Sequence, residues 1–329
     1  MKARLTPLIA ALLAVSCGGT DSPTSPTPTP TPPGALRITC PTGVVGSTTG
    51  TSVAVTFPQP TTTGGVAPVT VTCSPFSGSM FNVGTTSVSC QAVDARNTAA
   101  ACAFTVAVSR IPTLTRTRFL AFGDSTTAGE VTVPLSTATS GRGPVWGPLR
   151  LVPEASYPTQ LRTFLLGRYT AQAASIEVTN AGRSGESALD GAARFPGVLS
   201  STNADVVLLL EGYNDLSLYG RRGINVGIAG LDAMAKEARN RGARVFIASL
   251  TPSRPGGINT LDQEIIVEYN TRVRTLASGE GAVYVNLFDA FLPSLTTYVG
   301  VDGLHPTEAG YRRMAEEFLI AIRTTLEAQ

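Results

Sequence analysis

Histidine is nearly absent from this chain, because His305 is the only one among its 329 residues. Cysteine is missing from residue 103 to the C-terminus, so this part of the chain lacks the ligands that usually hold zinc. Histidine is the side chain whose charge changes near neutral pH, which suits it to act as a general base. A reaction that needs a histidine base therefore has to use His305, and we expect neither a metal nor another cofactor.

Other signals are missing as well. Lys and Arg number 25 against 23 Asp and Glu, and no basic run is interleaved with aromatic residues, so nucleic-acid binding is not indicated. No Gly-x-x-x-x-Gly-Lys loop is present to hold phosphate. The Gly-x-Ser-x-Gly pattern of one hydrolase class is approached only over residues 182–185, one residue short, which leaves Ser184 a weak candidate nucleophile.

The N-terminus has the pattern of an export signal. Lys2 and Arg4 precede an apolar run over residues 5–15, which is too short to cross a bilayer comfortably. We therefore predict an exported protein with a lipoprotein signal peptide over residues 1–16.

Cys17 ends a stretch that resembles the bacterial lipobox, in which the cysteine is lipidated and becomes the new N-terminus. Ala14 stands where leucine is usual, three places before that cysteine. The alternative is an ordinary secretory signal, but Cys17 would then be an unpaired thiol in an oxidising space. Several acyl chains on Cys17 would hold the protein stably to a membrane. The resemblance to lipoproteins, with Gly18 in place of Asp, implies a bacterial outer membrane, with the cell surface or periplasm as alternatives.

Proline recurs through residues 23–33, mostly in alternation with threonine. Such a run cannot form helix or sheet and stays in an extended polyproline II conformation. At about 3.1 Å per residue it would lift the following chain roughly 35 Å from a surface. We assign residues 17–33 to the lipidated cysteine and its linker.

The remaining four cysteines, Cys40, Cys73, Cys90 and Cys102, fall within one short stretch. An even set confined to a small segment predicts two disulfides, which require an oxidising compartment. Cys90 and Cys102 lie equidistant from Arg96, so they could face each other across a hairpin. Four cysteines allow three pairings, and the sequence leaves the choice open.

Residues 34–110 carry apolar residues at every second position, the pattern of half-buried strands. The runs lie at residues 52–57, 69–73, 87–90 and 102–108. Short strands at this spacing predict a β-sandwich. The cysteines and the motifs around them, such as Val83-Gly84-Thr85-Thr86, resemble the hyalin repeat. That resemblance implies an immunoglobulin-like fold in a spacer or adhesion module, and we expect a passive stalk rather than a binder.

Residues 117–329 have continuous apolar runs, which are typical of parallel strands covered on both faces. These runs lie at residues 119–122, 176–178, 206–210, 245–250 and 283–287. Apolar stripes with a helical period lie at residues 228–238, 265–276 and 311–326. Alternating strands and helices predict an α/β domain with a doubly wound parallel sheet, which binds ligands at the carboxyl ends of its strands.

Polar residues and glycines form four blocks in the loops of this domain. The first is Gly123-Asp124-Ser125, where the glycine allows a sharp turn that exposes the serine hydroxyl. The others are residues 180–185, 211–215 and 302–306. Each block alone is a weak signal, since Asn and Asp often mark simple turns. Four blocks in order, each after a strand or before the last helix, are a strong signal together.

The four blocks resemble the SGNH/GDSL hydrolase family over about 210 residues. The resemblance implies a flavodoxin-like three-layer fold and hydrolysis of esters. In that family the serine of the first block is the nucleophile, which is Ser125 here. The last block supplies the catalytic aspartate and histidine, which correspond to Asp302 and His305.

The same resemblance implies an oxyanion hole. Its donors would be the backbone N–H groups of Ser125 and Gly185 and the side-chain amide of Asn214, with Gly182 as a less favoured register for the glycine. Tyr269-Asn270 matches a further pair on the family's penultimate helix. Residues 130–156, which contain Trp146, exceed a minimal family member in length.

Elementary chemistry explains these residue types independently of the family. A serine hydroxyl is a poor nucleophile until a neighbouring base takes its proton. An aspartate bound to the other ring nitrogen fixes the tautomer of the base and stabilises the imidazolium that forms. The tetrahedral intermediate carries an oxyanion, and one donor to it is typically worth about 10²–10³ in turnover.

The substrate is much less defined by the sequence than the chemistry. We expect a carboxylic ester with a short to medium acyl chain, in a small molecule, glycan or lipid, of the kind cleaved by esterases, lysophospholipases or acetylesterases. Trp146 is a candidate for a wall of the substrate site, although an unremarkable surface loop explains it equally well. The alternative function is an envelope adhesion or carbohydrate-binding protein that uses the hydrolase fold as a scaffold. The oligomeric state is left open.

Overall fold

The computed structural model describes residues 34–134 and 146–328. The predicted signal peptide, Cys17 and the Pro/Thr-rich linker lie outside the described residues. Two compact units make up the chain, and the larger contains every described residue from 107 onwards. No helix among the described residues is long and apolar enough to cross a membrane.

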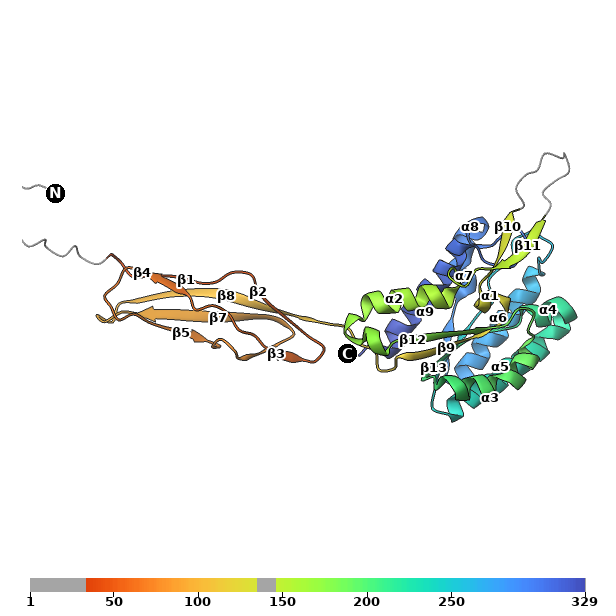
Figure 1. Ribbon diagram of the computed structural model, residues 1–329, viewed down its shortest axis with the longest axis horizontal. Helices are drawn as coiled ribbons and strands as arrows, with labels where there is room; N and C mark the ends of the chain where they lie inside the picture. Colours follow the sequence, from red (N-terminus) through yellow and green to blue (C-terminus); the bar gives the residue numbers. More distant parts are fainter. Residues whose placement is uncertain (1–33, 135–145, 329) are drawn as a thin grey trace, which may run out of the picture. The chain divides into compact units, whose positions relative to one another are not determined.

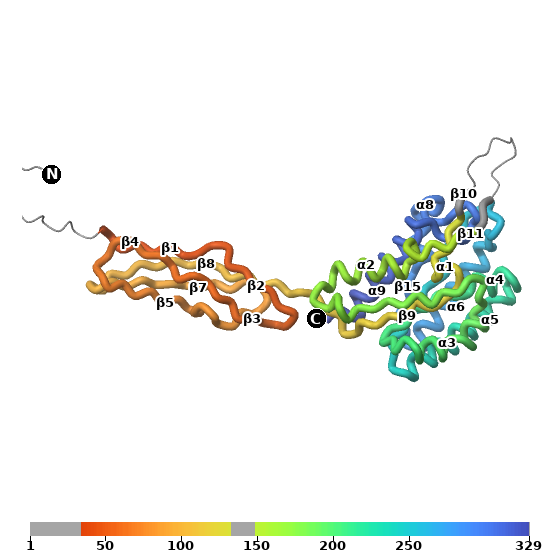
Figure 2. The backbone as a smooth tube through the Cα atoms, in the orientation of Figure 1, coloured from red at the N-terminus to blue at the C-terminus, as the bar shows by residue number. Residues whose placement is uncertain are grey.

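The N-terminal part consists of strands joined by turns (Figures 1 and 2). A four-stranded sheet has the order β2-β8-β7-β5, and two further pairs are β1-β4 and β3-β6. Side chains along β7 and β8 alternate between buried and exposed, as the sequence pattern predicts. The strands are β1 (Arg37–Thr39), β2 (Val44–Thr48), β3 (Ser52–Ala54), β4 (Thr61–Thr63), β5 (Thr70–Ser74), β6 (Met80–Asn82), β7 (Gly84–Val93) and β8 (Ala99–Arg110).

Two disulfides form in this part, as the even cysteine count predicts, and they join Cys40 to Cys102 and Cys73 to Cys90. The suggested pairing of Cys90 with Cys102 is therefore wrong. Cys73 is the direct partner of Cys90 in the antiparallel pair of β5 and β7. The disulfide of Cys90 therefore joins β7 to β5, and does not join β7 to β8 across the turn at Arg96.

A five-stranded parallel sheet forms the centre of the C-terminal part, with the order β12-β9-β13-β14-β15. In chain order this is 2-1-3-4-5, so the predicted flavodoxin-like arrangement is confirmed. The strands are β9 (Arg118–Gly123), β12 (Glu177–Gly182), β13 (Val206–Leu210), β14 (Arg244–Ala248) and β15 (Val283–Val285). The order reverses beside β9, and a ligand site is expected outside its carboxyl end.

Helices cover both faces of the sheet (Figure 1). Helices α2 and α9 pack on each other, while α3 packs on α5 and α5 on α6. The helices are α1 (Ser125–Ala128), α2 (Tyr157–Arg168), α3 (Ala188–Thr202), α4 (Tyr213–Tyr219), α5 (Gly223–Asn240), α6 (Gln263–Gly279), α7 (Leu287–Phe291), α8 (Leu295–Tyr298) and α9 (Glu308–Leu326), with 3-10 turns η1 (Thr170–Ser175), η2 (Gly220–Arg222) and η3 (Leu292–Ser294).

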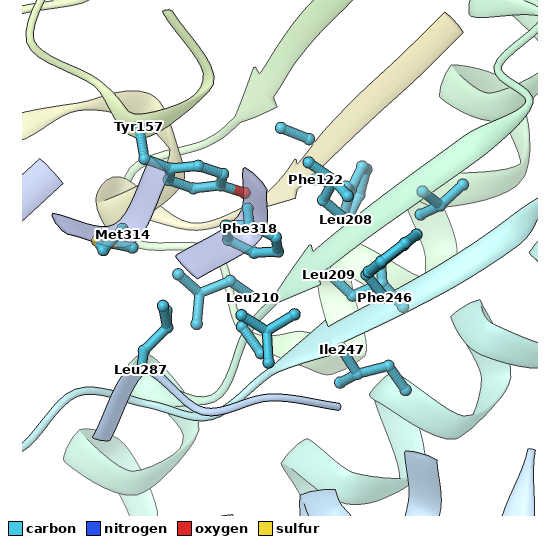
Figure 3. Packing of buried hydrophobic residues seen from close by; sticks show 14 of the residues in the cluster. Phe122, Tyr157, Leu208, Leu209, Leu210, Phe246, Ile247, Leu287, Met314 and Phe318 are labelled. Atoms are coloured by element: carbon cyan, nitrogen blue, oxygen red, sulfur yellow. The ribbon is translucent and has the colours of Figure 1, made fainter. Parts of the chain in front are cut away.

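The core lies between the sheet and these helices. Every residue of β13 is buried, which explains its unbroken apolar run. Figure 3 shows Tyr157 of α2 beside Phe318 of α9, and their rings stack with centroids 4.9 Å apart. The predicted stripe on α9 is fully buried, from Tyr311 to Leu326. This packing fixes the strand ends, and hence the loops that carry the polar blocks.

Residues 130–156 contain a β-hairpin where the sequence analysis expected a long loop. Strand β10 (Glu130–Pro134) pairs antiparallel with β11 (Trp146–Leu151). Val131 and Thr132 are β-branched and favour strand geometry, but the run is too short to stand out in the sequence. The side chain of Trp146 lies outside the described residues, so its role as a substrate wall stays a prediction.

Candidate active site

Ser125 lies directly outside the carboxyl end of β9, where the sheet order reverses. The strand ends at Gly123, and Asp124 caps the short helix α1 by accepting a hydrogen bond from the N–H of Thr126 at 2.9 Å. A Cβ on Gly123 would lie 2.2 Å from the carbonyl oxygen of Leu210, so only glycine fits this turn. The turn places Ser125 at the first position of α1, with its hydroxyl directed at His305.

His305 joins Ser125 to Asp302 through its two ring nitrogens. Its Nε2 lies 2.9 Å from Ser125 Oγ, and its Nδ1 lies 2.6 Å from Asp302 Oδ2. The three residues lie in two segments 177 or more positions apart, and all three are buried. The structure therefore brings together the predicted nucleophile, base and orienting carboxylate.

Asp302 is held in its ionised form. Burial raises its pKa, but hydrogen bonds from His305 and from the side chain of Asn259 outweigh burial and lower the pKa to about 2. The side-chain Nδ2 of Asn259 donates a hydrogen bond to Asp302 Oδ2 at 3.0 Å. The backbone N–H of His305 donates to the other carboxyl oxygen, Oδ1, at 3.2 Å. Sequence reasoning missed Asn259, which comes from a loop with no recognisable motif.

Gly185 and Asn214 lie close to each other on neighbouring loops. Asn214 Nδ2 donates to the carbonyl of Glu186 at 2.9 Å, next to Gly185 in the chain. Gly185 has a φ of +75°, which favours glycine, and nothing lies within 4 Å of the position its Cβ would take. Asp215 also joins these two loops, because its Oδ2 accepts a hydrogen bond from the backbone N–H of Ala188 at 2.9 Å.

Gly182, the other register for the oxyanion glycine, has a different environment. Its N–H already donates to Asn180 Oδ1 at 3.0 Å. A Cβ at Gly182 would lie 2.1 Å from the nitrogen of Ala128, so this glycine allows the close approach of α1 to β12. These contacts favour Gly185 for the oxyanion and give Gly182 a packing role.

Glu130 is a site residue that sequence reasoning missed. Its Oε2 lies 3.7 Å from His305 Nε2, and its Oε1 accepts a hydrogen bond from the hydroxyl of Ser184. The weak candidate nucleophile Ser184 therefore contacts Glu130, while Ser125 contacts the histidine. The only available signal for Glu130 was its position five residues after Ser125.

Comparison with known families decides the identity of this domain. A family model described as GDSL-like Lipase/Acylhydrolase matches residues 121–313, more than half of the chain. The chain belongs to this family. It is therefore an ester hydrolase, and a HYR-domain model matches residues 30–108 of the same chain. No curated protein matched the chain.

Solved structures similar to this GDSL hydrolase include three esterases. An acetylxylan esterase from Geobacillus stearothermophilus is 20% identical, with a TM-score of 0.48 over 64% of this chain and 94% of that one. A carbohydrate acetylesterase from Sinorhizobium meliloti is 18% identical, with a TM-score of 0.49 over 64% and 98%. An aryl esterase from M. smegmatis is 21% identical, with a TM-score of 0.47 over 63% and 99%.

Two buried carboxyl groups, those of Asp124 and Glu211, lie in the loops that carry the candidate active site of this GDSL hydrolase. Burial raises the pKa of Asp124 to about 7, and burial together with neighbouring carboxylates raises that of Glu211 well above its usual value. Asp124 Oδ2 and both carboxyl oxygens of Glu211 lack a hydrogen-bond partner among the described residues. Neither side chain reaches solvent.

The Tyr269-Asn270 pair on α6 supports two of the strand ends. Tyr269 Oη donates to the carbonyl of Glu211, the first residue of the third block, at 2.8 Å. The side chain of Asn270 bonds the backbone N–H of Leu250 at 2.8 Å and its carbonyl at 3.0 Å. The pair therefore holds the loops after β13 and β14 in place. Among the described residues, no cluster of His, Cys, Asp and Glu has the arrangement of a metal site.

Proposed function

We propose that this GDSL hydrolase cleaves carboxylic esters with Ser125 as nucleophile, His305 as general base and Asp302 as the residue that orients the base. The observation that carries the proposal is the unbroken chain of contacts from Ser125 Oγ through both nitrogens of His305 to Asp302, at 2.9 and 2.6 Å. These distances lie within the range required for proton transfer between a nucleophile and its base.

In the first half of the reaction, Ser125 Oγ attacks the carbonyl carbon of the ester while its proton passes to His305 Nε2. The carbonyl π electrons move to oxygen and form the oxyanion. When the oxyanion collapses, the bond to the alcohol oxygen breaks, and that oxygen takes the proton from Nε2. The alcohol leaves, and the acyl group remains on Ser125.

In the second half, a water molecule gives its proton to His305 Nε2 and attacks the acyl carbon. Collapse of this second intermediate breaks the bond to Ser125 Oγ, which recovers the proton from Nε2. The carboxylic acid leaves, and the enzyme returns to its starting state. Asp302 stays ionised throughout and stabilises the imidazolium in both halves, which agrees with its lowered pKa.

The oxyanion hole is formed in this proposal by the N–H groups of Ser125 and Gly185 and by the side-chain amide of Asn214. Asn214 uses one of its two amide hydrogens on the carbonyl of Glu186, which fixes the amide and leaves the second hydrogen for the substrate. Donors fixed before the reaction stabilise the developing charge without reorganisation. The substrate is an ester with a short to medium acyl chain.

The location of the reaction is the cell envelope. In this proposal residues 1–16 are a signal peptide and Cys17 is lipidated. Residues 17–33 are a linker that connects the lipidated cysteine to a stalk, which is formed by residues 34–110. The hydrolase domain, residues 117–329, follows the stalk. Two disulfides in the stalk support an oxidising location outside the cytoplasm. Cys17→Ala is expected to move the protein from the membrane fraction to the soluble fraction, and continued membrane retention would contradict the anchor.

Replacement of Ser125 tests the catalytic proposal. Ser125→Ala should abolish hydrolysis of 4-nitrophenyl acetate and butyrate, and it should remove labelling of the protein by a fluorophosphonate. Ser184→Ala is the matched control, because Ser184 is a second serine near His305, and this variant should still be labelled. Full activity of Ser125→Ala, or label found on Ser184, would show that Ser125 is not the nucleophile.

A further inference from the structure

Glu130 places a carboxylate next to the reacting groups of this hydrolase. Its Oε2 lies 3.7 Å from His305 Nε2, the nitrogen that also contacts Ser125 Oγ. The side chain is 16% exposed, so a ligand in the site can approach it. The catalytic scheme above gives this carboxylate no role.

The backbone holds Glu130 firmly in this position. Gly129 ends α1 with a φ of +101°, and a Cβ there would lie 2.7 Å from Cβ of Ser156, so the chain turns sharply just before Glu130. Glu130 then pairs with Leu151 across the β10–β11 hairpin, and its carbonyl accepts from Tyr311 Oη at 2.5 Å. The carboxylate is thus presented from a rigid segment and is fixed further by the Ser184 hydroxyl.

The position of Glu130 places its carboxylate beside the alcohol part of a bound ester. His305 Nε2 must give its proton to the leaving alcohol oxygen, so this oxygen has to come within hydrogen-bond distance of Nε2. A carboxylate 3.7 Å from the same nitrogen therefore lies beside the alcohol part of the ester. A negative charge on that part would meet the like charge of Glu130 in a partly desolvated site.

We propose that Glu130 determines specificity by excluding esters whose alcohol part carries a negative charge next to the scissile bond. The proposal rests on the function proposed above, because it assumes that His305 protonates the leaving alcohol. The substrates it favours are esters with an uncharged or cationic alcohol part. Carboxylate- and phosphate-bearing alcohols are disfavoured.

The test compares two esters of nearly equal size and reactivity, methyl 3-acetoxybenzoate and the 3-acetoxybenzoate anion. We expect the wild-type protein to prefer the neutral ester by about 10-fold or more in kcat/KM, and to lose part of this preference as salt is added. Glu130→Gln keeps an oxygen that accepts from Ser184 but removes the charge. It should bring the ratio of the two kcat/KM values close to the ratio of the esters' rates with hydroxide.

Two control variants separate charge at this place from other effects. Glu177→Gln removes one negative charge at the exposed start of β12, the opposite end of the strand from the active site, and should keep the wild-type ratio. Ser184→Ala removes the hydrogen bond but keeps the Glu130 carboxylate, so the ratio should also persist, whatever happens to the rate itself.

The outcomes distinguish this proposal from the catalytic one. An unchanged ratio in Glu130→Gln, a wild-type protein without preference, or a ratio lost equally in Ser184→Ala would overturn the role of Glu130. If the wild-type protein hydrolyses neither ester nor 4-nitrophenyl acetate, the proposed function itself fails. Hydrolysis of the neutral ester by Glu130→Gln shows that the variant is folded.

Discussion

The β-rich part at residues 34–110 and the α/β part at residues 117–328 reach stability in different ways. The β part buries alternate residues over much of β7 and β8 and is cross-linked by two disulfides. The α/β part has no cysteine and buries whole strands such as β13 between two layers of helices. A small domain buries too little apolar surface to be stable on that alone, whereas a domain of about 200 residues does not need cross-links.

The two parts also differ in what their loops carry. In the α/β part the loops outside the carboxyl ends of parallel strands converge, and they bring Ser125, Asn214 and His305 to one edge of the sheet. In the β part, loops such as that at Asp94 hold the hairpin itself together, since the Asp94 carboxylate accepts the N–H groups of Val66, Arg96 and Thr98. In the α/β part the helices and strands are stable without help from these loops, so the loop side chains can serve a reaction.

The largest expected difference between the parts is the response to His305→Ala. Loss of the proposed general base should reduce kcat for 4-nitrophenyl acetate by at least about 10³-fold. No second histidine exists to replace it. The unfolding transition of the β part should not change, and steady-state kinetics with calorimetry measure both. A loss of less than 10-fold would mean that another group acts as the base.

Phe318→Ala should destabilise the α/β part selectively. Phe318 is fully buried and stacks on Tyr157, so its truncation leaves a cavity and should cost about 3–5 kcal/mol. Phe76→Ala in the β part is the control, since Phe76 is 71% exposed and should change stability little. Differential scanning calorimetry measures the unfolding of both parts, and equal losses of stability in the two variants would contradict the burial argument.

Removal of a disulfide should destabilise the β part selectively. The Cys73→Ala/Cys90→Ala variant opens a loop of 17 residues and the Cys40→Ala/Cys102→Ala variant one of 62, with expected costs of about 3 and about 4 kcal/mol. Both variants should keep the wild-type kcat. Differential scanning calorimetry checks the order of the two costs. A simultaneous fall in kcat would show that the α/β part depends on the cross-links.

The smallest expected effect is the loss of stability of the α/β part when Asp302 is protonated at low pH. Its pKa is lowered to about 2 in the folded protein, so its stabilising contribution of about 2 kcal/mol is complete above pH 4 and disappears as the pH falls from 4 to 2. Asp302→Asn should remove this part of the acid destabilisation of the α/β part. Unfolding curves at pH 5, 4 and 3 measure it, and parallel curves for the two proteins would contradict the lowered pKa.

Much of the fold could be predicted because it is written in local patterns. The continuous run at residues 206–210 became β13 with the same bounds, and the stripe beginning at Tyr311 became the buried face of α9. The disulfide pairing could not be predicted, because the strand of Cys90 has a neighbour on each side in the sheet. Only the register of β5 on β7 places Cys73 directly opposite Cys90. The β10–β11 hairpin was missed because its strands are short and flanked by glycine and proline.

The sequence by itself determined which residues are candidates for the proposed chemistry. The single histidine restricted the candidate base to His305, and the four loop blocks favoured Ser125 over Ser184 as the candidate nucleophile. Only the tertiary structure decided which other groups share their space. Glu130 lies beside His305, Asn259 bonds Asp302, and Ser184 bonds Glu130. These residues come from separate segments, which meet because parallel strands align their carboxyl ends at one edge of the sheet.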